Sequence, residues 1–214
     1  MAVAPEHHPS SAERILAAAA DLFAQHGFDG VSTRQIAAAT DLNIATIHHH
    51  VGTKRDLYLA VVERFCDSDE ALVDGIVEAI DDSVIADRDR FRAALYLLID
   101  QILAHAEAHP LRHRFAVRRW LDESDELDQR ESAMSLKLFR RLETVLERGK
   151  KLGSVRADLN VGYFLRGADW MIVGYFTAGA FSWKTFRADA TSRSNRKQFR
   201  TFLFDYMHTM VEAH

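Results

Sequence analysis

The spacing of apolar residues along the chain is helical almost from end to end. In the segment 11–26, Ile15, Ala19, Leu22 and Phe23 recur at intervals of three and four, which places them on one face of a helix. Similar spacing recurs in the segments 57–76, 89–108, 111–121, 127–148, 161–182 and 193–212. No segment shows the alternation of apolar and polar residues that a half-buried strand requires. The pattern predicts an all-α protein of about nine helices.

Two unusually short helices are predicted within the segment 32–56. Ser32 and Asn43 are favoured caps for helices that begin one residue later, and Thr53 caps a further helix. Asp41 stands in the turn between the two short helices, where the backbone often needs a left-handed conformation that Asp tolerates. Two short helices joined by such a turn are typical of a helix-turn-helix, a motif that reads DNA.

The helix predicted for residues 11–26 completes a head around this pair. Ser10 and Glu13 form its capping box, and Gly27 ends it. Its apolar face can cover the two short helices, so residues 11–56 are predicted to form a three-helix DNA-binding head. Residues 1–10 are predicted to be a flexible tail. The helix that begins at Lys54 is long enough to leave the head and to continue into a larger helical domain, residues 57–214.

The segment 46–57 resembles the signature of TetR-family transcriptional regulators. That signature is a small residue, then Thr-Leu-Tyr-x-His-Phe, a short loop, Lys, an acidic residue and Leu. The corresponding residues here are Thr46-Ile47-His48-His49-His50-Val51-Gly52-Thr53-Lys54-Arg55-Asp56-Leu57. The resemblance extends upstream through Gly27-Phe28 and Ile36-Ala37, so it covers about the first sixty residues. His48, Val51 and Asp41 depart from the usual Tyr, Phe and Gly, and an imidazole reaches less far toward a phosphate than a phenol.

The resemblance implies a sequence-specific regulator whose partner is a double-stranded DNA operator. It favours a repressor that a small-molecule ligand releases from a palindromic operator, although the residues themselves leave activation open. Candidate DNA contacts lie at the amino terminus of the first short helix, along the outward face of the second, and at the start of the next. They are Ser32, Thr33, Arg34, Asn43, Ile44, Ala45, Thr46, His48, His49 and Lys54.

The charge of the chain qualifies this interpretation. The net charge is −4, with 27 basic and 31 acidic residues, whereas many DNA-binding domains are basic overall. Phosphate contacts are local, however, because salt screens charges beyond about 10 Å. Residues 31–55 hold three basic residues and one acidic one, and helix amino termini can also bind phosphate. We therefore expect modest affinity for each subunit, with a homodimer making up the difference.

The segment 161–182 predicts an interface between two copies of the chain. It is apolar on most faces, and a helix of that kind must be covered on several sides. Small residues within it would allow close approach, and the segment 193–212 places aromatic residues beside it. The predicted homodimer interface comprises Val161, Gly174, Ala178, Phe199, Phe202 and Tyr206.

Large apolar residues between positions 91 and 170 predict a ligand pocket. They lie on the helices that enclose the ligand in proteins that this chain resembles. The candidate pocket residues are Phe91, Leu95, Tyr96, Leu98, Ile102, Phe115, Trp120, Leu138, Phe139, Phe164 and Trp170. The alternative is that they only form core. A pocket of this kind suits a mainly apolar small molecule, with Tyr96, His105, His113 and Asp169 available for polar contacts.

Other classes of function have little support in the residues. Three consecutive histidines, 48–50, point about 100° apart on a helix and cannot converge on one metal ion. Pro110 interrupts the helix that would align His105, His109 and His113. We expect no metal, no cofactor and no enzyme activity, because no nucleophile-and-base set or phosphate loop is present. A helical structural module without a DNA role remains the alternative.

The single cysteine, Cys66, fits a reducing compartment, and the amino terminus has no apolar core of the kind that a signal peptide needs. No uncharged run reaches the roughly 18 residues expected of a spanning helix. We therefore expect a cytoplasmic location and no membrane partner.

Overall fold

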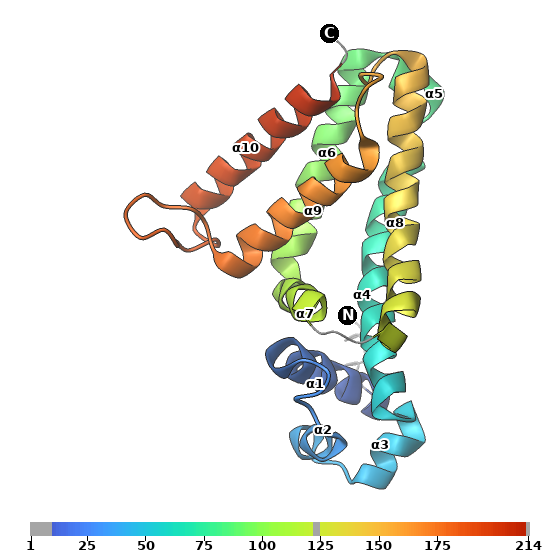
Figure 1. Cartoon of the computed structure of the whole chain (residues 1–214), viewed down its shortest axis with the longest axis vertical. Helices are drawn as coiled ribbons and strands as arrows, with labels where there is room; N and C mark the ends of the chain where they lie inside the picture. The colour runs from blue at the N-terminus through green and yellow to red at the C-terminus, as the bar shows by residue number, and fades with distance from the viewer. Residues whose placement is uncertain (1–9, 122–124, 213–214) are drawn as a thin grey trace, which may run out of the picture.

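The structure is a computed structural model, and it describes residues 10–121 and 125–212, except the side chains of residues 125–131, 134 and 135. The predicted flexible tail lies outside the described residues apart from Ser10. The described part is all-α, as predicted, and contains ten helices (Figure 1). They are α1 (Ser11–His26), α2 (Thr33–Thr40), α3 (Ile44–Val51), α4 (Lys54–Val77), α5 (Asp82–Ala86), α6 (Arg88–Ala108), α7 (Pro110–Leu121), α8 (Asp125–Leu152), α9 (Val161–Ala178) and α10 (Arg193–Val211).

The structure differs from the sequence-based expectation by one additional helix and by the ends of others, notably α9. The short helix α5 was not predicted, because five residues are too few to show a helical period; Asp81 caps it by accepting a hydrogen bond from the Val84 amide. Helix α9 ends at Ala178 rather than at residue 182. Gly179 stops it, with φ of 91° and its amide donating to the Tyr175 carbonyl. The chain between α9 and α10 is consequently longer than predicted.

The head is formed by α1, α2, α3 and the first turns of α4, at the lower end of Figure 1. The apolar residues of α1 face inward as their spacing predicts, with Ile15 and Phe23 buried. They pack on Ile36, Ile47 and Leu57, which are also buried. The core of the head is therefore built from the residues that occupy the inward positions of each short helix.

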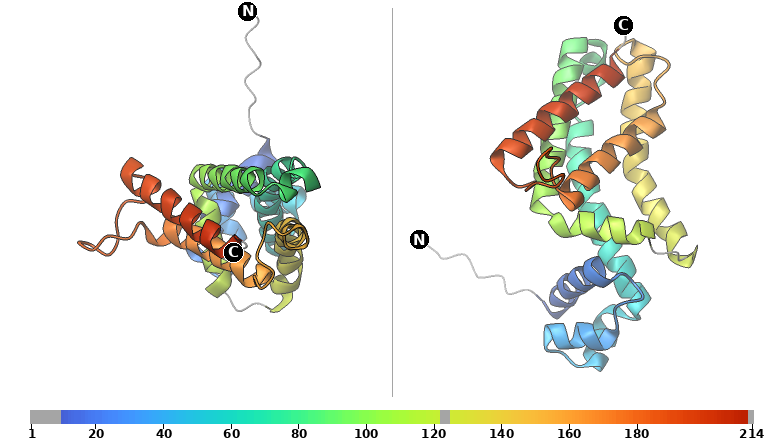
Figure 2. Two further views of the ribbon diagram at one scale, coloured as in Figure 1. Left: turned by 90° about the horizontal axis from the view of Figure 1, so that it is seen from above. Right: turned by 60° about the vertical axis from the view of Figure 1, so that its left-hand side comes forward.

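The larger helical region lies above the head. Helices α4 and α8 run side by side, and α6, α9 and α10 complete the body (Figures 1 and 2). A second apolar cluster fills this region; it includes Ile76, Ile85, Phe91, Phe164 and Leu165. Helix α4 belongs to both regions, because it begins beside α3 and continues between α6 and α8. A continuous helix thus connects the two clusters.

Helix α7 provides a second connection between the head and the body. It packs along α1, and Phe115 joins the apolar cluster of the head, with ring centroids 5.2 Å from Tyr58 and 5.5 Å from Phe65. The Arg118 guanidinium donates a hydrogen bond of 3.0 Å to the Gln25 carbonyl at the end of α1. The head is therefore held by α7 as well as by α4, so a displacement of either helix would move the head.

Within the described residues, no helix has the combination of length and hydrophobicity needed to cross a membrane.

Candidate DNA-binding surface and ligand cavity

The turn between α2 and α3 is fixed by local hydrogen bonds. Asp41 takes the left-handed conformation, with φ of 55°, and its amide donates to the carbonyls at the end of α2. Asn43 then caps α3, because its Oδ1 accepts from the Thr46 amide at 2.8 Å and from the Thr46 hydroxyl at 3.0 Å. Arg14 of α1 donates to the Thr40 carbonyl and so holds the turn against α1. These contacts set the direction in which α3 leaves the turn.

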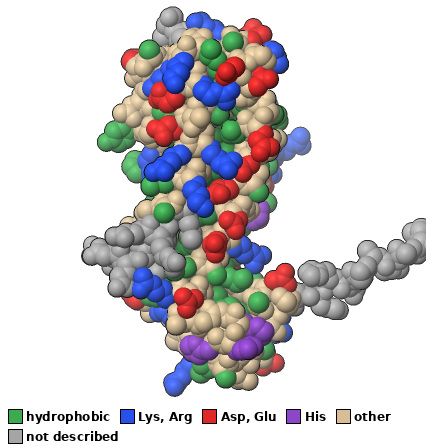
Figure 3. All heavy atoms as spheres, turned by 90° about the vertical axis from the view of Figure 1, so that its right-hand side faces the viewer, with side chains coloured by type: hydrophobic (Ala, Val, Ile, Leu, Met, Phe, Trp, Pro, Cys, Tyr) green, Lys and Arg blue, Asp and Glu red, His purple; other side chains and the backbone are tan. Residues whose placement is uncertain are grey.

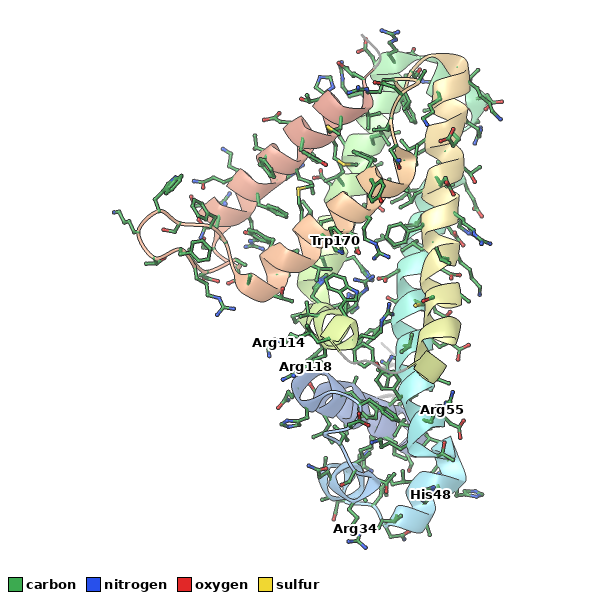
Figure 4. All side chains as sticks on the ribbon, viewed as in Figure 1. Arg34, His48, Arg55, Arg114, Arg118 and Trp170 are labelled. Atoms are coloured by element: carbon green, nitrogen blue, oxygen red, sulfur yellow. The ribbon has the colours of Figure 1, made fainter. Side chains whose placement is uncertain are left out.

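Helix α3 is anchored on one side and open on the other. Ile47 is 1% exposed and faces α1 and α2, whereas Ile44, Ala45, His48 and His49 are exposed. Asn43 and Thr46 lie at the start of α3, and the remaining candidates lie nearby at the amino termini of α2 and α4, so all ten occupy the same end of the molecule (Figure 1). Figure 4 shows Arg34 and His48 projecting from this end, and Figure 3 shows histidine side chains on the surface of the head.

Two of these side chains already have contacts that orient them. His48 Nδ1–H donates a hydrogen bond of 2.9 Å to the Gly52 carbonyl, which leaves Nε2 for a partner outside the chain. Lys54 Nζ lies 4.1 Å from the centroid of the Phe28 ring, a cation–π contact. Thr53 and Asp56 form a reciprocal capping box at the start of α4. The Lys54 ammonium is therefore held beside an amino terminus whose amides favour an anion.

A cavity of about 140 Å³ lies in the body, between α4, α6, α8, α9 and α10. Its wall is mainly apolar. Six of the eleven residues predicted to form a pocket line it: Leu95, Leu98, Ile102, Leu138, Phe139 and Phe164. The structure thus brings together the predicted residues from α6, α8 and α9.

The other five candidates lie elsewhere. Phe91 is buried in the apolar cluster of the body, and Tyr96 stacks on Phe204 with ring centroids 4.7 Å apart. Phe115 and Trp120 border a smaller neighbouring hollow of about 70 Å³. Trp170 is 57% exposed on α9. The expectation from helical spacing that these residues are buried is wrong for Trp170 and for Trp120, which is 42% exposed, because no neighbouring helix in the described part of the chain covers them. For Phe91, Tyr96 and Phe115 the spacing gave the buried side of the helix but not the space that each side chain reaches.

One end of the cavity is polar. It is lined by His105, His113 and Asp169, which were expected to offer polar contacts, and by Asp69 and Arg112, which were not expected. Asp69 of α4 is 7% exposed and forms an ion pair with Arg112 of α7. His105 Nε2–H donates to Asp69 Oδ1 at 3.1 Å. Asp69 falls on the apolar face of α4, three residues before Leu72. A carboxylate at such a position was the feature of the sequence that could have pointed to this site. An acid on an apolar stripe predicts a buried partner, although it does not name the partner.

Burial controls the ionisation of this polar end. His113 is 1% exposed, its Nε2–H donates to the Ala106 carbonyl at 3.1 Å, and burial lowers its pKa to about 4. Burial also lowers the pKa of His105 and raises the pKa of Asp169. The two histidines are consequently neutral near pH 7. The polar end then consists of neutral imidazoles, two carboxyl groups and the Arg112 guanidinium.

The residues predicted for the dimer interface divide into inward-facing and outward-facing sets. Val161 is 3% exposed within the apolar cluster of its own subunit, and Phe199 stacks on Tyr175 with ring centroids 3.9 Å apart. Tyr206 also contacts rings of its own subunit. Gly174, Ala178 and Phe202 are the outward-facing members, and nothing lies within 4 Å of a Cβ built on Gly174. Packing between α9 and α10 therefore occupies half of the predicted interface.

A helix held at a tight capped turn, with one face buried and the other open, makes this chain a helix-turn-helix protein. The sequence model described as "Bacterial regulatory proteins, tetR family" matches residues 15–61. The head of this chain is therefore similar to the DNA-binding region of TetR-family regulators, and the curated proteins that match it are named as transcriptional regulators.

Two curated regulators are similar to this chain in sequence, and a solved structure is similar to it in fold. The HTH-type transcriptional repressor AcnR of Corynebacterium glutamicum is 39% identical over 62 residues, which are 28% of this chain and 33% of AcnR. The HTH-type transcriptional activator FasR of Mycolicibacterium smegmatis is 29% identical over 98 residues, 46% of this chain and 43% of FasR. The fatty acid degradation regulator FadR of Bacillus halodurans has a similar structure, with a TM-score of 0.68 and 16% identity, covering 93% of this chain and 97% of FadR. The matched segments thus span less than half of either curated relative.

Proposed function

We propose that this protein is a homodimeric transcriptional regulator that binds a palindromic operator through α3. The observation that carries the proposal is the exposed face of α3, presented by a turn that Asp41 and Asn43 hold in place. A helix presented in this way fits the major groove of B-DNA. AcnR is named as a repressor and is 39% identical to this chain over 62 residues, so we propose repression rather than activation.

The contacts proposed for DNA fall into two kinds. Ile44, Ala45 and Thr46, at the start of α3, lie where a recognition helix reaches base edges. His48 and Lys54 are proposed to bind phosphate, because one has a free ring nitrogen and the other carries an ammonium at a helix amino terminus. Phosphate contacts position the head, whereas contacts to base edges select the sequence.

The Lys54→Ala variant tests this placement. Once genomic fragments bound by the parent have been selected, we expect the variant to bind operator and random DNA about tenfold more weakly, since a charge-assisted contact contributes about 1.5 kcal/mol. The slope of log affinity against log salt should fall by about one for each lost contact. Lys151→Ala is the matched control, because Lys151 is exposed at the far end of α8. Equal binding by parent and Lys54→Ala would refute the phosphate contact.

We further propose that a mainly apolar small molecule occupies the cavity and shifts the heads. Helix α4 supports this route, because Leu72 lines the cavity and lies roughly 27 Å along the helix from Lys54. Helix α7 supports it too, since Arg112 lines the cavity and Phe115 packs in the head. A dimer reads half-sites about 34–36 Å apart, so a small tilt of either helix would change the distance between the two heads and their fit to the half-sites.

Ligand and operator must then weaken each other's binding by the same factor. A compound selected by thermal shift should bind the operator complex more weakly than the free protein, by the factor by which it lowers operator affinity. Leu142 lines the cavity, so the larger side chain of Leu142→Trp should fill part of it. This variant should still bind operator, but the compound should no longer raise its melting temperature. Tight binding to Leu142→Trp, or binding that leaves operator affinity unchanged, would show that the compound does not act through the cavity.

A further inference from the structure

Large exposed apolar side chains gather on one part of the molecule. Those on α9, on α10 and on the segment between them are Tyr163, Trp170, Phe181, Trp183, Phe186 and Phe202, with exposed fractions of 54% to 94%. Three of them belong to residues 179–192, which we call the aromatic hairpin. It projects from the ends of α9 and α10 away from the body (Figures 1 and 2). An apolar surface of this extent that is exposed to solvent marks an interaction site.

The aromatic hairpin has a defined backbone. Ala180 and Ala188 exchange two backbone hydrogen bonds of 2.9 and 2.7 Å. The Arg187 side chain donates to the carbonyls of Ala178 and Thr177 at the end of α9. At the base, a Cβ on Gly179 would lie 2.7 Å from the Ala188 carbonyl oxygen, so the close approach requires glycine. The hairpin therefore presents its rings in a fixed arrangement before any partner arrives.

The rings are displayed at a conformational cost. Phe186 has φ of 58°, a left-handed conformation that is unfavourable for a bulky residue, and its side chain is 81% exposed. Phe181 packs edge-to-face on Trp183 and on Phe186, with ring centroids 4.9 and 5.9 Å away. Trp183 itself is 94% exposed. Strain that holds an apolar ring in water is typical of a binding element.

The exposed area of these rings indicates that a second copy of the chain covers them. At about 200 Å² for each ring, Tyr163, Trp170 and Phe202 offer roughly 400 Å², and the hairpin adds roughly 450 Å². A standard interface needs about 800 Å² from each partner. The rings on the helices reach only about half of that, whereas helices and hairpin together reach it. The hairpin also connects α9 directly to α10, so both sets of rings belong to adjoining segments of the chain.

We propose that the aromatic hairpin clasps the second subunit and supplies about half of the apolar dimer contact. This inference rests on the homodimer of the proposed function. Trp183 is its central anchor, because it is the largest and most exposed of the three rings and Trp is enriched at interface hot spots. The hairpin is a separate element from α9 and α10, so it can be altered without changing the core beneath them.

Sedimentation of two hairpin variants tests the clasp. In the full chain, Phe181→Ser with Trp183→Ser and Phe186→Ser should raise the dimer dissociation constant at least 100-fold. Phe186→Gly is a milder variant that glycine's tolerance of positive φ should not unfold, and about a tenfold rise is expected. Leu97→Ser with Leu121→Ser is the control, because both leucines are at least 53% exposed and lie on α6 and α7. The control should dimerise like the parent.

Fluorescence provides a second readout. In a variant with Trp120→Phe and Trp170→Phe, Trp183 is the remaining tryptophan, and its emission should move to longer wavelength as dilution separates the subunits. A dimer in which Trp183 emits as a solvated indole would overturn the clasp, and so would parent-like dimerisation of the triple variant. A parent that stays monomeric at 100 µM (about a hundredfold above a micromolar dissociation constant) would overturn the homodimer as well.

Discussion

Replacing Asp69 with alanine is expected to lower the free energy of unfolding by about 3 kcal/mol, because the change leaves the Arg112 guanidinium without its buried counter-charge. The carboxylate is 10% exposed and the guanidinium 24%, so water screens the pair only in part. His105 loses its acceptor in the same change. For a chain of this size the loss corresponds to a fall in Tm of about 6–12 °C. Urea unfolding at pH 7 measures it.

Asp74→Ala is the matched control on the same helix. Asp74 pairs with Arg141, but these side chains are 31% and 45% exposed, and surface pairs contribute about 0–1 kcal/mol. Asp69→Leu with Arg112→Met should recover most of the lost stability, since apolar replacement of a buried ion pair is often neutral. A loss below about 1 kcal/mol for Asp69→Ala would mean that solvent or a rearranged side chain satisfies Arg112.

Acidification is expected to remove about 3 kcal/mol of stability through His113. Burial holds the pKa of His113 at about 4 in the folded chain, against about 6.5 when unfolded. Between these values the unfolded chain binds the extra proton, so stability is fully present above pH 6.5 and is lost as pH falls toward 4. Arg112, His105 and His109 all oppose the imidazolium, and its buried Nδ1 has no acceptor among the described residues.

His113→Phe isolates this contribution. The replacement keeps a flat ring against Phe176, on which His113 stacks with centroids 5.1 Å apart. We expect the variant to be less stable than the parent at pH 7.5, because the bond to the Ala106 carbonyl is lost. Its free energy of unfolding should nevertheless decline less steeply between pH 6.5 and 4. Parallel pH profiles for parent and variant would show that His113 is not the titrating group.

Several parts of the DNA-binding head could be predicted because they depend on neighbouring residues. Ser32, Asn43 and Thr53 cap three helices at the predicted positions, and Asp41 takes the left-handed conformation that the turn requires. Each of these interactions closes over three or four residues. The exposed face of α3 follows from the same local information. Once the caps define the helix, Ile47 marks its buried side, and the opposite side is therefore exposed.

The cavity and its polar end could not be predicted in the same way. Asp69 and Arg112 are 43 positions apart, and the contact between them depends on how α7 packs against α4. Phe91 and Leu95 lie one turn apart on α6, yet Leu95 lines the cavity and Phe91 belongs to the surrounding core. Helical spacing gives the buried side of a helix, but the neighbouring helices decide which buried residues border empty space.

The amino-acid sequence by itself determined the longer helices, the caps of the head's helices and the head's open face, because hydrogen bonds and apolar periods within a few residues specify them. Tertiary structure decided the partner of Asp69, the neutral state of His113 and the division of the α9 and α10 residues between core and surface. Those properties depend on burial, and burial is produced by contacts between helices distant in the chain. The aromatic hairpin belongs to the second group, since Gly179 and Arg187 shape it only where the end of α9 meets the returning chain.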